Sequence, residues 1–390
     1  MKQIYRSKAF WLLALAASLI FFQAYMIAPL IPKLSEVFGV TEQYIGLVIP
    51  AYMITYGISI LFYGVLSDRF GRMRIIRFSL LAFILLTALT ALAQTSSQLI
   101  MLRLFTGLGA SGVIPMALAL VGDLYEPHER GKPLGLLFAA MEGGMALGST
   151  AGVVLEPFIG WRMLFLGIAI LGAIILWFIS FQIDFKSQKP ELNKPNVRQV
   201  FSKFFHLLSM SRGAKTYSSV FWNGIFHSGI YTWLGYYFSV KYILGEIGIG
   251  LAILGYGVPG FLFGSSIGRA ADRWGRFRLI IPGLGIAALA TALLATNISV
   301  ILAAIAVTVI SLGYDLTQPL FAGIVTELGG KKYGGQAMGL NVFALFTGFG
   351  VGSLIFGEVL SIGLENAFLI FAALQGLMML FAIRMFKAEK

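Results

Sequence analysis

Long apolar segments alternate with short charged segments along nearly the whole chain. A helix that crosses the hydrocarbon core of a bilayer needs about 20 apolar residues, because each residue advances the helix by about 1.5 Å. Charge clusters and turn residues divide the sequence into twelve apolar segments of this kind. These predicted spans are residues 8–31, 43–65, 76–94, 98–122, 133–156, 161–183, 214–240, 247–267, 279–296, 299–325, 335–360 and 364–385. The pattern therefore predicts an all-α membrane protein with twelve transmembrane helices.

The composition agrees with this pattern. Charged residues make up 12% of the chain and apolar residues 58%, with a mean hydropathy of +0.85, whereas soluble domains are about one-quarter charged. The formal net charge is +12. The basic residues form short clusters between apolar segments and do not line a face among aromatic residues, so nucleic acid is not an expected partner. The chain has no cysteine, which excludes disulfides, thiolate metal sites and cysteine nucleophiles. We also expect no metal and no cofactor.

The basic residues also predict how the chain is oriented, because Lys and Arg gather on the cytoplasmic side of membrane proteins. If the N-terminus is cytoplasmic, 25 of the 29 basic residues lie on that side. The exceptions are Lys33, Arg162 and Lys241 on the other side and Arg103 within a span. An even number of spans places the C-terminus in the cytoplasm too. The first apolar segment is too long for a signal peptide and is expected to remain as the first helix.

The sequence repeats itself at an offset of 204 residues. Residues 64–74, GVLSDRFGRMR, align with residues 268–278, GRAADRWGRFR. The same offset, without gaps, pairs Glu42 with Glu246, Tyr52 with Tyr256, Pro115 with Pro319, Gly131 with Gly335, Gly144 with Gly348, and Gly148 with Gly352. Chance matches would scatter over many offsets. The repeat therefore predicts two pseudo-symmetric six-helix lobes, an N-terminal lobe of residues 1–183 and a C-terminal lobe of residues 214–390.

Residues 184–213 form the long hydrophilic segment between the two halves, with two prolines and six Lys or Arg residues. We interpret them as a cytoplasmic linker. Residues 197–210 carry apolar side chains at near-helical spacing, so this part of the segment could form a helix along the membrane surface. The alternative is that the whole segment is solvated.

Two six-helix lobes, a cytoplasmic linker and the motif Gly-x-Leu-Ser-Asp-Arg-x-Gly-Arg between the second and third helices resemble the major facilitator superfamily over nearly the whole chain. The resemblance implies that the two lobes rock about a central substrate site and so give alternating access. It implies a small-molecule substrate, protons and the lipid bilayer as partners. We expect the chain to work as a monomer.

The motif and its second copy are predicted to form a gate. Without a side chain, Gly64 would admit a helix of the opposite lobe, and Gly71 suits a tight turn between two helices. Asp68 could cap a neighbouring helix or pair with Arg72, and Asp123 is another candidate partner of Arg72. The resemblance implies that this cluster holds the cytoplasmic end closed; alternatively, its basic residues only set topology. The complete predicted gate is Gly64, Asp68, Arg69, Gly71, Arg72, Asp123, Asp272 and Arg276.

Arg103, followed by Gly107 and Gly109, resembles the fourth-helix motif of the family. A guanidinium cannot lose its proton, and placing it within the bilayer costs about 2.5–3.5 kcal/mol by insertion scales. Arg103 is therefore expected to face a wet cavity or a partner; the alternative is that it extends to the outer surface. The resemblance implies a role in proton coupling or in holding an anionic substrate.

Gly144, Gly148 and Gly152 recur at every fourth position of the fifth predicted helix. Small residues at this spacing form a flat face on which another helix can pack closely. The pattern resembles the antiporter signature Gly-x-x-x-Gly-Pro-x-x-Gly-Gly. Ser149 and Val153 replace its proline and last glycine, so we expect the packing face to remain while the indication of export is weaker.

Besides Arg103, three ionisable residues lie in the middle part of a predicted span: Glu142, His227 and Asp315. A low-dielectric medium disfavours the charged form of a carboxyl group, so Glu142 and Asp315 are predicted to load and release protons. An unperturbed histidine titrates near neutral pH, which makes His227 another candidate carrier. The alternatives are a pair with Arg103 or a substrate contact for the carboxyl groups, and simple packing for His227.

The resemblance implies that the first, fourth, seventh and tenth helices line the central cavity. Gln23, Arg103, His227 and Asp315 would then converge there. The residues predicted to bind substrate are Gln23, Tyr25, Asn223, Tyr231 and Gln318.

These observations together predict a secondary active transporter of a bacterial inner membrane that exports a small molecule by proton antiport. It most resembles the twelve-helix drug and sugar efflux branch. A proton-coupled uptake symporter or a facilitator is the alternative, because the fold does not set direction, and a receptor or scaffold without transport is a further one. An enzyme is not expected, since the sequence has no HExxH, P-loop or Gly-x-Ser-x-Gly motif.

Overall fold

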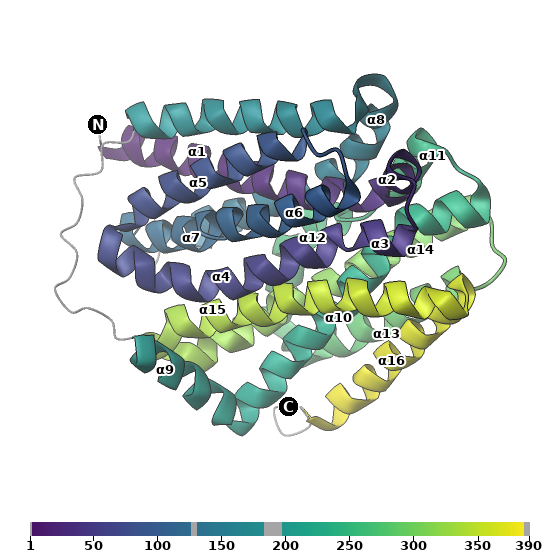
Figure 1. Cartoon of the computed structure of the whole chain (residues 1–390). Helices are drawn as coiled ribbons and strands as arrows, with labels where there is room; N and C mark the ends of the chain where they lie inside the picture. The colour runs from purple at the N-terminus through teal and green to yellow at the C-terminus, as the bar shows by residue number, and fades with distance from the viewer. Residues whose placement is uncertain (1, 126–130, 183–196, 386–390) are drawn as a thin grey trace.

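The computed structural model describes residues 2–125, 131–182 and 197–385, in which every regular element is a helix (Figure 1). The N-terminal half consists of α1 (Lys2–Met26), the 3₁₀ helix η1 (Ala28–Leu30), α2 (Ile31–Phe38), α3 (Glu42–Gly46), α4 (Val48–Phe70), α5 (Arg72–Thr90), α6 (Ser96–Ala110), α7 (Val113–Leu124) and α8 (Gly131–Gln182). The C-terminal half consists of α9 (Val197–Ser209), α10 (Ser211–Tyr242), α11 (Glu246–Ile253), α12 (Val258–Trp274), α13 (Phe277–Leu294), α14 (Val300–Asp315), α15 (Gln318–Val359), η2 (Leu360–Ile362) and α16 (Leu364–Met385).

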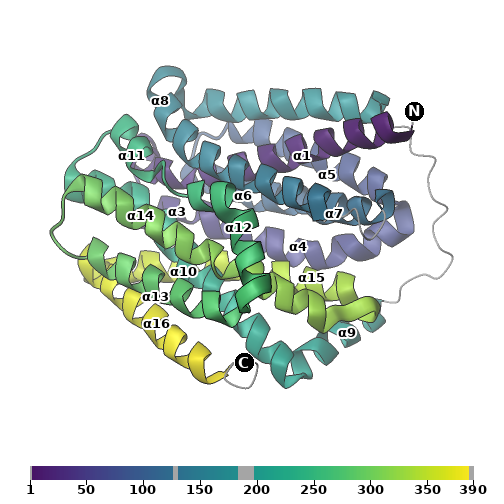
Figure 2. The same cartoon turned by 180° about the vertical axis from the view of Figure 1, so that it is seen from behind.

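Twelve crossings of a membrane follow from these helices. Ten described segments are long and apolar enough to span a bilayer. One of them, Pro133–Phe181, has 49 residues and turns at Gly160, where φ is 75°, so it crosses twice. The less apolar α10, 32 residues long, makes the twelfth crossing. The predicted all-α fold with twelve helices in two six-helix lobes is confirmed, and Figures 1 and 2 show the lobes lying against each other.

Five predicted spans are interrupted where the sequence predicts continuous helices: the first, second, fourth, eighth and tenth. Proline explains the breaks in the fourth and tenth. Pro115 and Pro319 lack the N–H that would bond the carbonyl four residues earlier, which belongs to Ser111 and Asp315 respectively. The preceding helices, α6 and α14, end at Ala110 and Asp315. As a result, Asp315 lies at a helix end in the middle of a span.

The internal repeat extends to the details of the backbone. Gly71, after α4, has φ 87° and ψ 141°, and its repeat mate Gly275, after α12, has φ 90° and ψ 141°. Positive φ is a conformation that glycine adopts at little cost, which confirms the predicted tight turn at Gly71. Thr95 caps α6 by accepting from Gln98 N, and Ser299, 204 residues later, caps α14 by accepting from Leu302 N.

The close packing face predicted for the fifth crossing lies against the first. A Cβ atom at Gly144 would overlap the carbonyl oxygen of Ser18 in α1, and one at Gly148 would overlap that of Phe22. The repeat mate Gly348 in α15 meets the carbonyl oxygen of Phe221 in α10 in the same way. The two lobes therefore share a close helix–helix contact at equivalent positions of the repeat.

The two lobes are also in contact at the end of the bundle that carries α2, α3 and α11, which we call the far end (Figure 1). The opposite end, where α1 begins and α16 ends, is the terminal end. At the far end, Gly235 of α10 lies against the backbone of Pro29, and Lys33 of α2 lies 3.9 Å from Glu246 of α11. These contacts close the seam between the lobes at that end.

The segment 197–210 that the sequence offers as a surface helix is α9. Its Phe204 and Leu207 are buried among Tyr217, Val325 and Leu340 of the C-terminal lobe, whereas Phe205 remains exposed. The helix is therefore docked on that lobe through one apolar face. The rest of the predicted linker, up to residue 196, lies outside the described residues, and the domain boundaries stay a prediction.

Candidate functional site

A closed circle of seven rings joins the two lobes in the middle of the bundle. Neighbouring ring centroids lie between 4.8 and 6.4 Å apart. The rings belong, in order round the circle, to Phe21, Tyr25, Tyr231, Tyr256, His227, Phe349 and Phe346. The first two come from the N-terminal lobe and the other five from the C-terminal lobe, so any relative movement of the lobes must rearrange this circle.

Arg103 lies beside the circle and is fully buried, with 0% of its surface exposed. Its Nη1 donates to Oε1 of Gln23 at 2.8 Å, and its guanidinium lies 4.1 Å from the ring centroid of Tyr52. Backbone carbonyls of Ala24 and Val48 accept from the remaining nitrogens at 3.5 and 3.4 Å. The side chain thus does not extend to the outer surface, and its partners among the described residues are neutral.

His227 is held in the opposite lobe by the repeat mate of Tyr52. The hydroxyl of Tyr256 lies 2.8 Å from His227 Nδ1, and the ring of Tyr314 lies 3.8 Å from the imidazole. Each lobe therefore uses the same repeat tyrosine to fix its own buried basic side chain. His227 is 1% exposed, and its contacts combine aromatic packing with a hydrogen bond.

Asp315, the last residue of α14, lies beside the start of α12 and contacts its backbone. A methyl group at Gly260 would come within 2.6 Å of Asp315 Oδ1, and the backbone N–H of Gly260 donates to this carboxyl group. Gly260 belongs to the first turn of α12, where free N–H groups and the helix dipole favour a negative charge. The other oxygen, Oδ2, is buried and has no hydrogen-bond partner among the described residues.

Glu142 approaches Asp315 from the other lobe. Its neighbour Gly143 faces Phe261, the residue after Gly260, across the seam between α8 and α12. Its buried Oε2 has no hydrogen-bond partner in the described ranges. The two carboxyl groups thus lie on either side of one inter-lobe seam, each with an unpaired oxygen. Neither pairs with Arg103.

Four of the five residues predicted to bind substrate are joined by hydrogen bonds in two pairs. Asn223 Nδ2 donates to Gln318 Oε1 at 3.1 Å, and Thr317 donates to Asn223 Oδ1 at 3.2 Å. The hydroxyl of Tyr231 donates to the backbone oxygen of Tyr25 at 2.8 Å, across the two lobes. The fifth residue, Gln23, accepts from Arg103 instead. Gln23 Nε2 remains buried without a partner in the described part of the chain.

At the terminal end, the first copy of the gate motif is partly described. Arg72 Nη1 donates to the carbonyl oxygen of Ala119 at 2.6 Å, so the guanidinium reaches α7, the helix that carries Asp123. Arg69 lies over the ring of Phe70 at 5.2 Å and is exposed. The surroundings of Gly64 and the side chains of Asp68 and Asp123 lie outside what the structure describes, so the predicted pairing of Arg72 with Asp123 stays a prediction.

The second copy contains an ion pair that sequence analysis missed. Arg276 Nη1 lies 2.6 Å from Glu327 Oε1, and Arg212 Nη2, at the start of α10, lies 3.2 Å from Glu327 Oε2. Glu327 is the repeat mate of Asp123, so adding the repeat offset to Asp123 would have found it. Asp272, also predicted for this gate, is exposed.

Three tyrosines of the central site, Tyr52, Tyr256 and Tyr314, are not predicted from the sequence because tyrosine in an apolar helix carries no distinctive signal.

Comparison with known proteins agrees with this architecture. The family model described as Major Facilitator Superfamily matches residues 13–245 and 220–390. Multidrug resistance protein 3 of Bacillus subtilis (strain 168) is 30% identical over 198 residues, which cover 50% of this chain and 38% of that protein. The uncharacterized MFS-type transporter YwfA of the same organism is 28% identical over 357 residues, covering 89% of this chain and 85% of that protein.

Solved structures show the same fold. The partially occluded inward open structure of the xylose transporter XylE from E. coli has a TM-score of 0.77 at 18% identity and covers 97% of both chains. At this identity the likeness concerns the fold alone. The family model matches nearly the whole length of the chain, and the chain has two lobes with a repeated turn motif. The chain therefore belongs to the Major Facilitator Superfamily.

Proposed function

We propose that this protein exports small amphipathic molecules by proton antiport, with its two lobes rocking about the circle of rings. The observation that carries the proposal is that Glu142 and Asp315 lie on the two sides of the seam between α8 and α12, each with one buried oxygen that has no hydrogen-bond partner among the described residues. The export direction is supported by the similarity of half the chain to a multidrug resistance protein. The inner membrane of a bacterium, with both termini in the cytoplasm, is the proposed location.

The position of the two carboxyl groups offers a mechanism of coupling. Two ionised carboxylates at the seam repel each other in a medium of low dielectric constant, whereas a proton on either of them removes that repulsion. Protonation would therefore favour a closer approach of α8 and α12, and deprotonation their separation. Because these helices belong to different lobes, loading a proton changes the energy of the conformation itself.

The same groups indicate a class of substrate. The aromatic circle offers apolar faces, and the two carboxyl groups offer negative charge, while Arg103 is already occupied by Gln23 and Tyr52. Aromatic faces and carboxylates both attract cations. We infer that the site takes an amphipathic molecule with an aromatic part and a positive charge, which would compete with protons for Glu142 and Asp315.

Alternating access requires contacts at each end that can open. At the far end, these would be the contact between Gly235 and Pro29 and the ion pair between Lys33 and Glu246. At the terminal end, the two copies of the gate motif would hold the closed state. The far end is closed in this structure, so the proposed cycle begins by opening that end.

Uptake of a polyhydroxylated molecule is the second candidate. The cluster of Asn223, Thr317 and Gln318 carries several amide and hydroxyl groups, which suit hydrogen bonds to sugar hydroxyls. The fold is shared with a xylose transporter and a nucleoside transporter. This candidate and the leading proposal make opposite predictions about the substrate.

Reconstituted protein tests the choice directly. Proteoliposomes loaded with a pH-sensitive dye would be offered an aromatic cation such as tetraphenylphosphonium, and in parallel xylose or a nucleoside. We expect the cation alone to produce a saturable change of lumenal pH. A pH change or uptake with the sugar or the nucleoside, and none with the cation, would favour the second candidate. If no compound changes the lumenal pH, the result would argue against proton-coupled transport.

The ion pair at the second gate motif gives a prediction of its own. Changing Glu327 to Gln leaves Arg276 and Arg212 without their shared carboxylate, so we expect transport to slow several-fold. All three side chains are partly exposed, so the pair Arg276–Glu327 should contribute only about 0.5–1 kcal/mol of coupling energy to stability. A double-mutant cycle would measure this coupling energy: thermal unfolding of Glu327→Gln, of Arg276→Gln and of the variant that carries both changes.

An exchange of charges provides the control. The double variant Arg276→Glu with Glu327→Arg restores opposite charges at the same positions and should recover part of the rate that each single reversal loses. If both single variants transport at the wild-type rate, the ion pair has no part in the cycle.

A further inference from the structure

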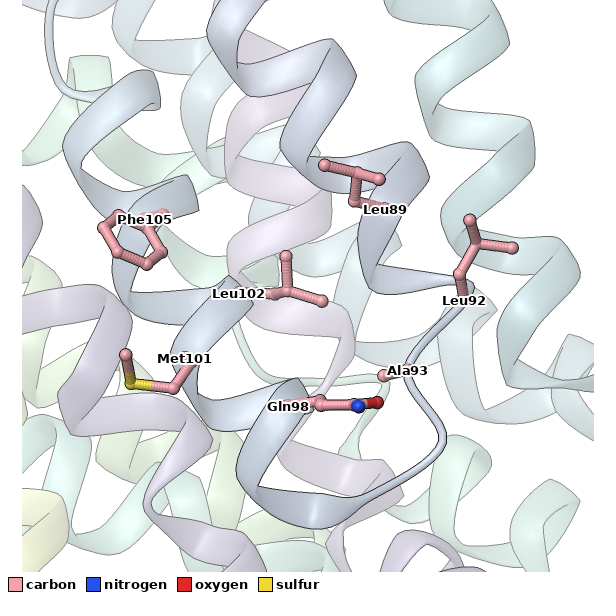
Figure 3. A pocket seen from close by; sticks show the side chains of 7 residues that line it. All are labelled: Leu89, Leu92, Ala93, Gln98, Met101, Leu102 and Phe105. Carbon is pink, nitrogen blue, oxygen red and sulfur yellow. The ribbon is translucent and has the colours of Figure 1, made fainter.

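An apolar groove runs along the outer face of the N-terminal lobe, away from the central site. It has a volume of about 310 Å³ and is lined by Leu89, Leu92, Ala93, Gln98, Met101, Leu102 and Phe105 (Figure 3). Four of these side chains, Leu89, Leu92, Met101 and Phe105, are between 44% and 67% exposed. Such a surface would be unfavourable in water, so in a membrane-spanning lobe it faces acyl chains.

The groove is polar at one end only. Gln98 lies in the first turn of α6, whereas Phe105 lies seven residues further along that helix, about 10 Å towards the middle of the bundle. Figure 3 shows Gln98 and Ala93 at one end of the groove and Phe105 at the other. A ligand that fits this groove must therefore have a polar group at the far end and an apolar chain that points inward.

A cation is hydrogen-bonded to a lining residue at the polar end of the groove. Arg162, just after the turn at Gly160, donates from Nη2 to the carbonyl oxygen of Ala93 at 2.6 Å, and Ala93 lines the groove. Its guanidinium lies over Trp161 at 4.3 Å from the ring centroid. The side chain is exposed, and no other described residue accepts a hydrogen bond from it. Its remaining N–H groups can serve an anion at the mouth of the groove.

We propose that this groove binds one acyl chain of a membrane glycerophospholipid whose phosphate group accepts hydrogen bonds from Arg162. Charge complementarity selects the phosphate, and the direction of the groove selects a chain that runs inward from it. Neither part of the ligand would suffice alone. An acyl chain without phosphate leaves Arg162 unpaired, and a free phosphate leaves the apolar groove empty.

The bound lipid would steady the helix that holds the central arginine. Met101 and Phe105 line the groove on one face of α6, and Arg103 lies between them in sequence but projects to the buried side. With about 3.6 residues per turn, these are opposite faces of the same helix. The lipid thus packs directly behind the arginine that contacts Gln23 and Tyr52.

A photolabelling experiment tests the proposal. Purified full-length protein in detergent would be incubated with phosphatidylglycerol that carries a diazirine in its acyl chain, and the labelled peptides would be identified by mass spectrometry. We expect label within residues 89–105. Diacylglycerol with the same chain should label this segment roughly tenfold less, because it lacks the charged hydrogen bond. Inorganic phosphate at millimolar concentration should not compete.

Two variants and one control complete the test. Arg162→Gln removes the phosphate contact, and Leu92→Asp places a carboxylate in the groove, at a side chain that is 67% exposed and lies two residues beyond the end of α5. Both should reduce labelling of residues 89–105 about tenfold, while Arg278→Gln, an exposed arginine at the terminal end, should not. Wild-type labelling in both variants, or equal labelling by diacylglycerol, would overturn the proposal.

Discussion

Replacing Asp315 by Asn and Glu142 by Gln together is expected to abolish proton-driven accumulation of substrate while the protein still folds. The amide groups keep the shape of the carboxyl groups but cannot take up a proton. With one proton exchanged per substrate molecule, a pH difference of one unit supplies about 1.4 kcal/mol, which sustains roughly a tenfold substrate gradient. In the double variant this gradient should fall to unity, although substrate should still equilibrate across the membrane.

The single variants show whether the two carboxyl groups act as one site. If they share a proton across the seam, either Asp315→Asn or Glu142→Gln alone should remove most of the coupling, since the partner loses its neighbour. Glu358→Gln is a matched control, because Glu358 is an exposed carboxylate of α15 outside the aromatic circle. A tenfold gradient that persists in the double variant would show that the proton is carried elsewhere.

Much of the fold follows from the sequence because its signals are local. The twelve apolar segments and the repeat predict the lobes, and Gly71 and Gly275 mark turns that recur with nearly equal backbone angles. The interruption of the fourth and tenth crossings could also have been predicted. Pro115 and Pro319 are a repeat pair, and proline removes the backbone hydrogen bond to the residue four positions earlier. Applied to Pro319, that rule places Asp315 at a helix end.

The partners of the buried polar residues could not be predicted in the same way. That Arg103 meets Gln23 and Tyr52, and not a carboxyl group, depends on the rotation of α1, α4 and α6 about their axes. The apolar pattern sets these rotations only coarsely, because a helix that is apolar on every side can be buried on any face. The position of Glu142 relative to Asp315 depends on how α8 packs against α12, where Gly143 lies beside Phe261. No local sequence pattern encodes this contact between the lobes.

The repeat is the exception to this limit, because it carries long-range information. The offset pairs Tyr52 with Tyr256, and each fixes the buried basic side chain of its own lobe. Glu327 was reachable from Asp123 in the same way. The pair Arg276–Glu327 in turn supports the prediction that Arg72 pairs with Asp123, since the two halves share the geometry of this turn.

The largest loss of stability is expected from changing Gly144 to Val. The Cβ atom of any residue here would overlap the carbonyl oxygen of Ser18, and backbone cannot move aside as a side chain can. Overpacking of this kind costs about 1–3 kcal/mol and more when backbones must separate, so we expect about 3 kcal/mol. The midpoint of thermal unfolding in detergent would measure it. Gly348→Val should act similarly in the other lobe, where the obstacle is the carbonyl oxygen of Phe221.

Gly143 offers a control within the same helix. A Cβ atom at Gly143 would lie 4.0 Å from the ring of Phe261, an ordinary contact, so Gly143→Val should leave stability nearly unchanged or raise it slightly through better helix propensity. The two variants share composition, helix and depth, and they differ only in the face that they modify. If both unfold at the same temperature, α1 and α8 do not approach at Gly144. A lower midpoint for Gly144→Val alone would locate the close contact on that face.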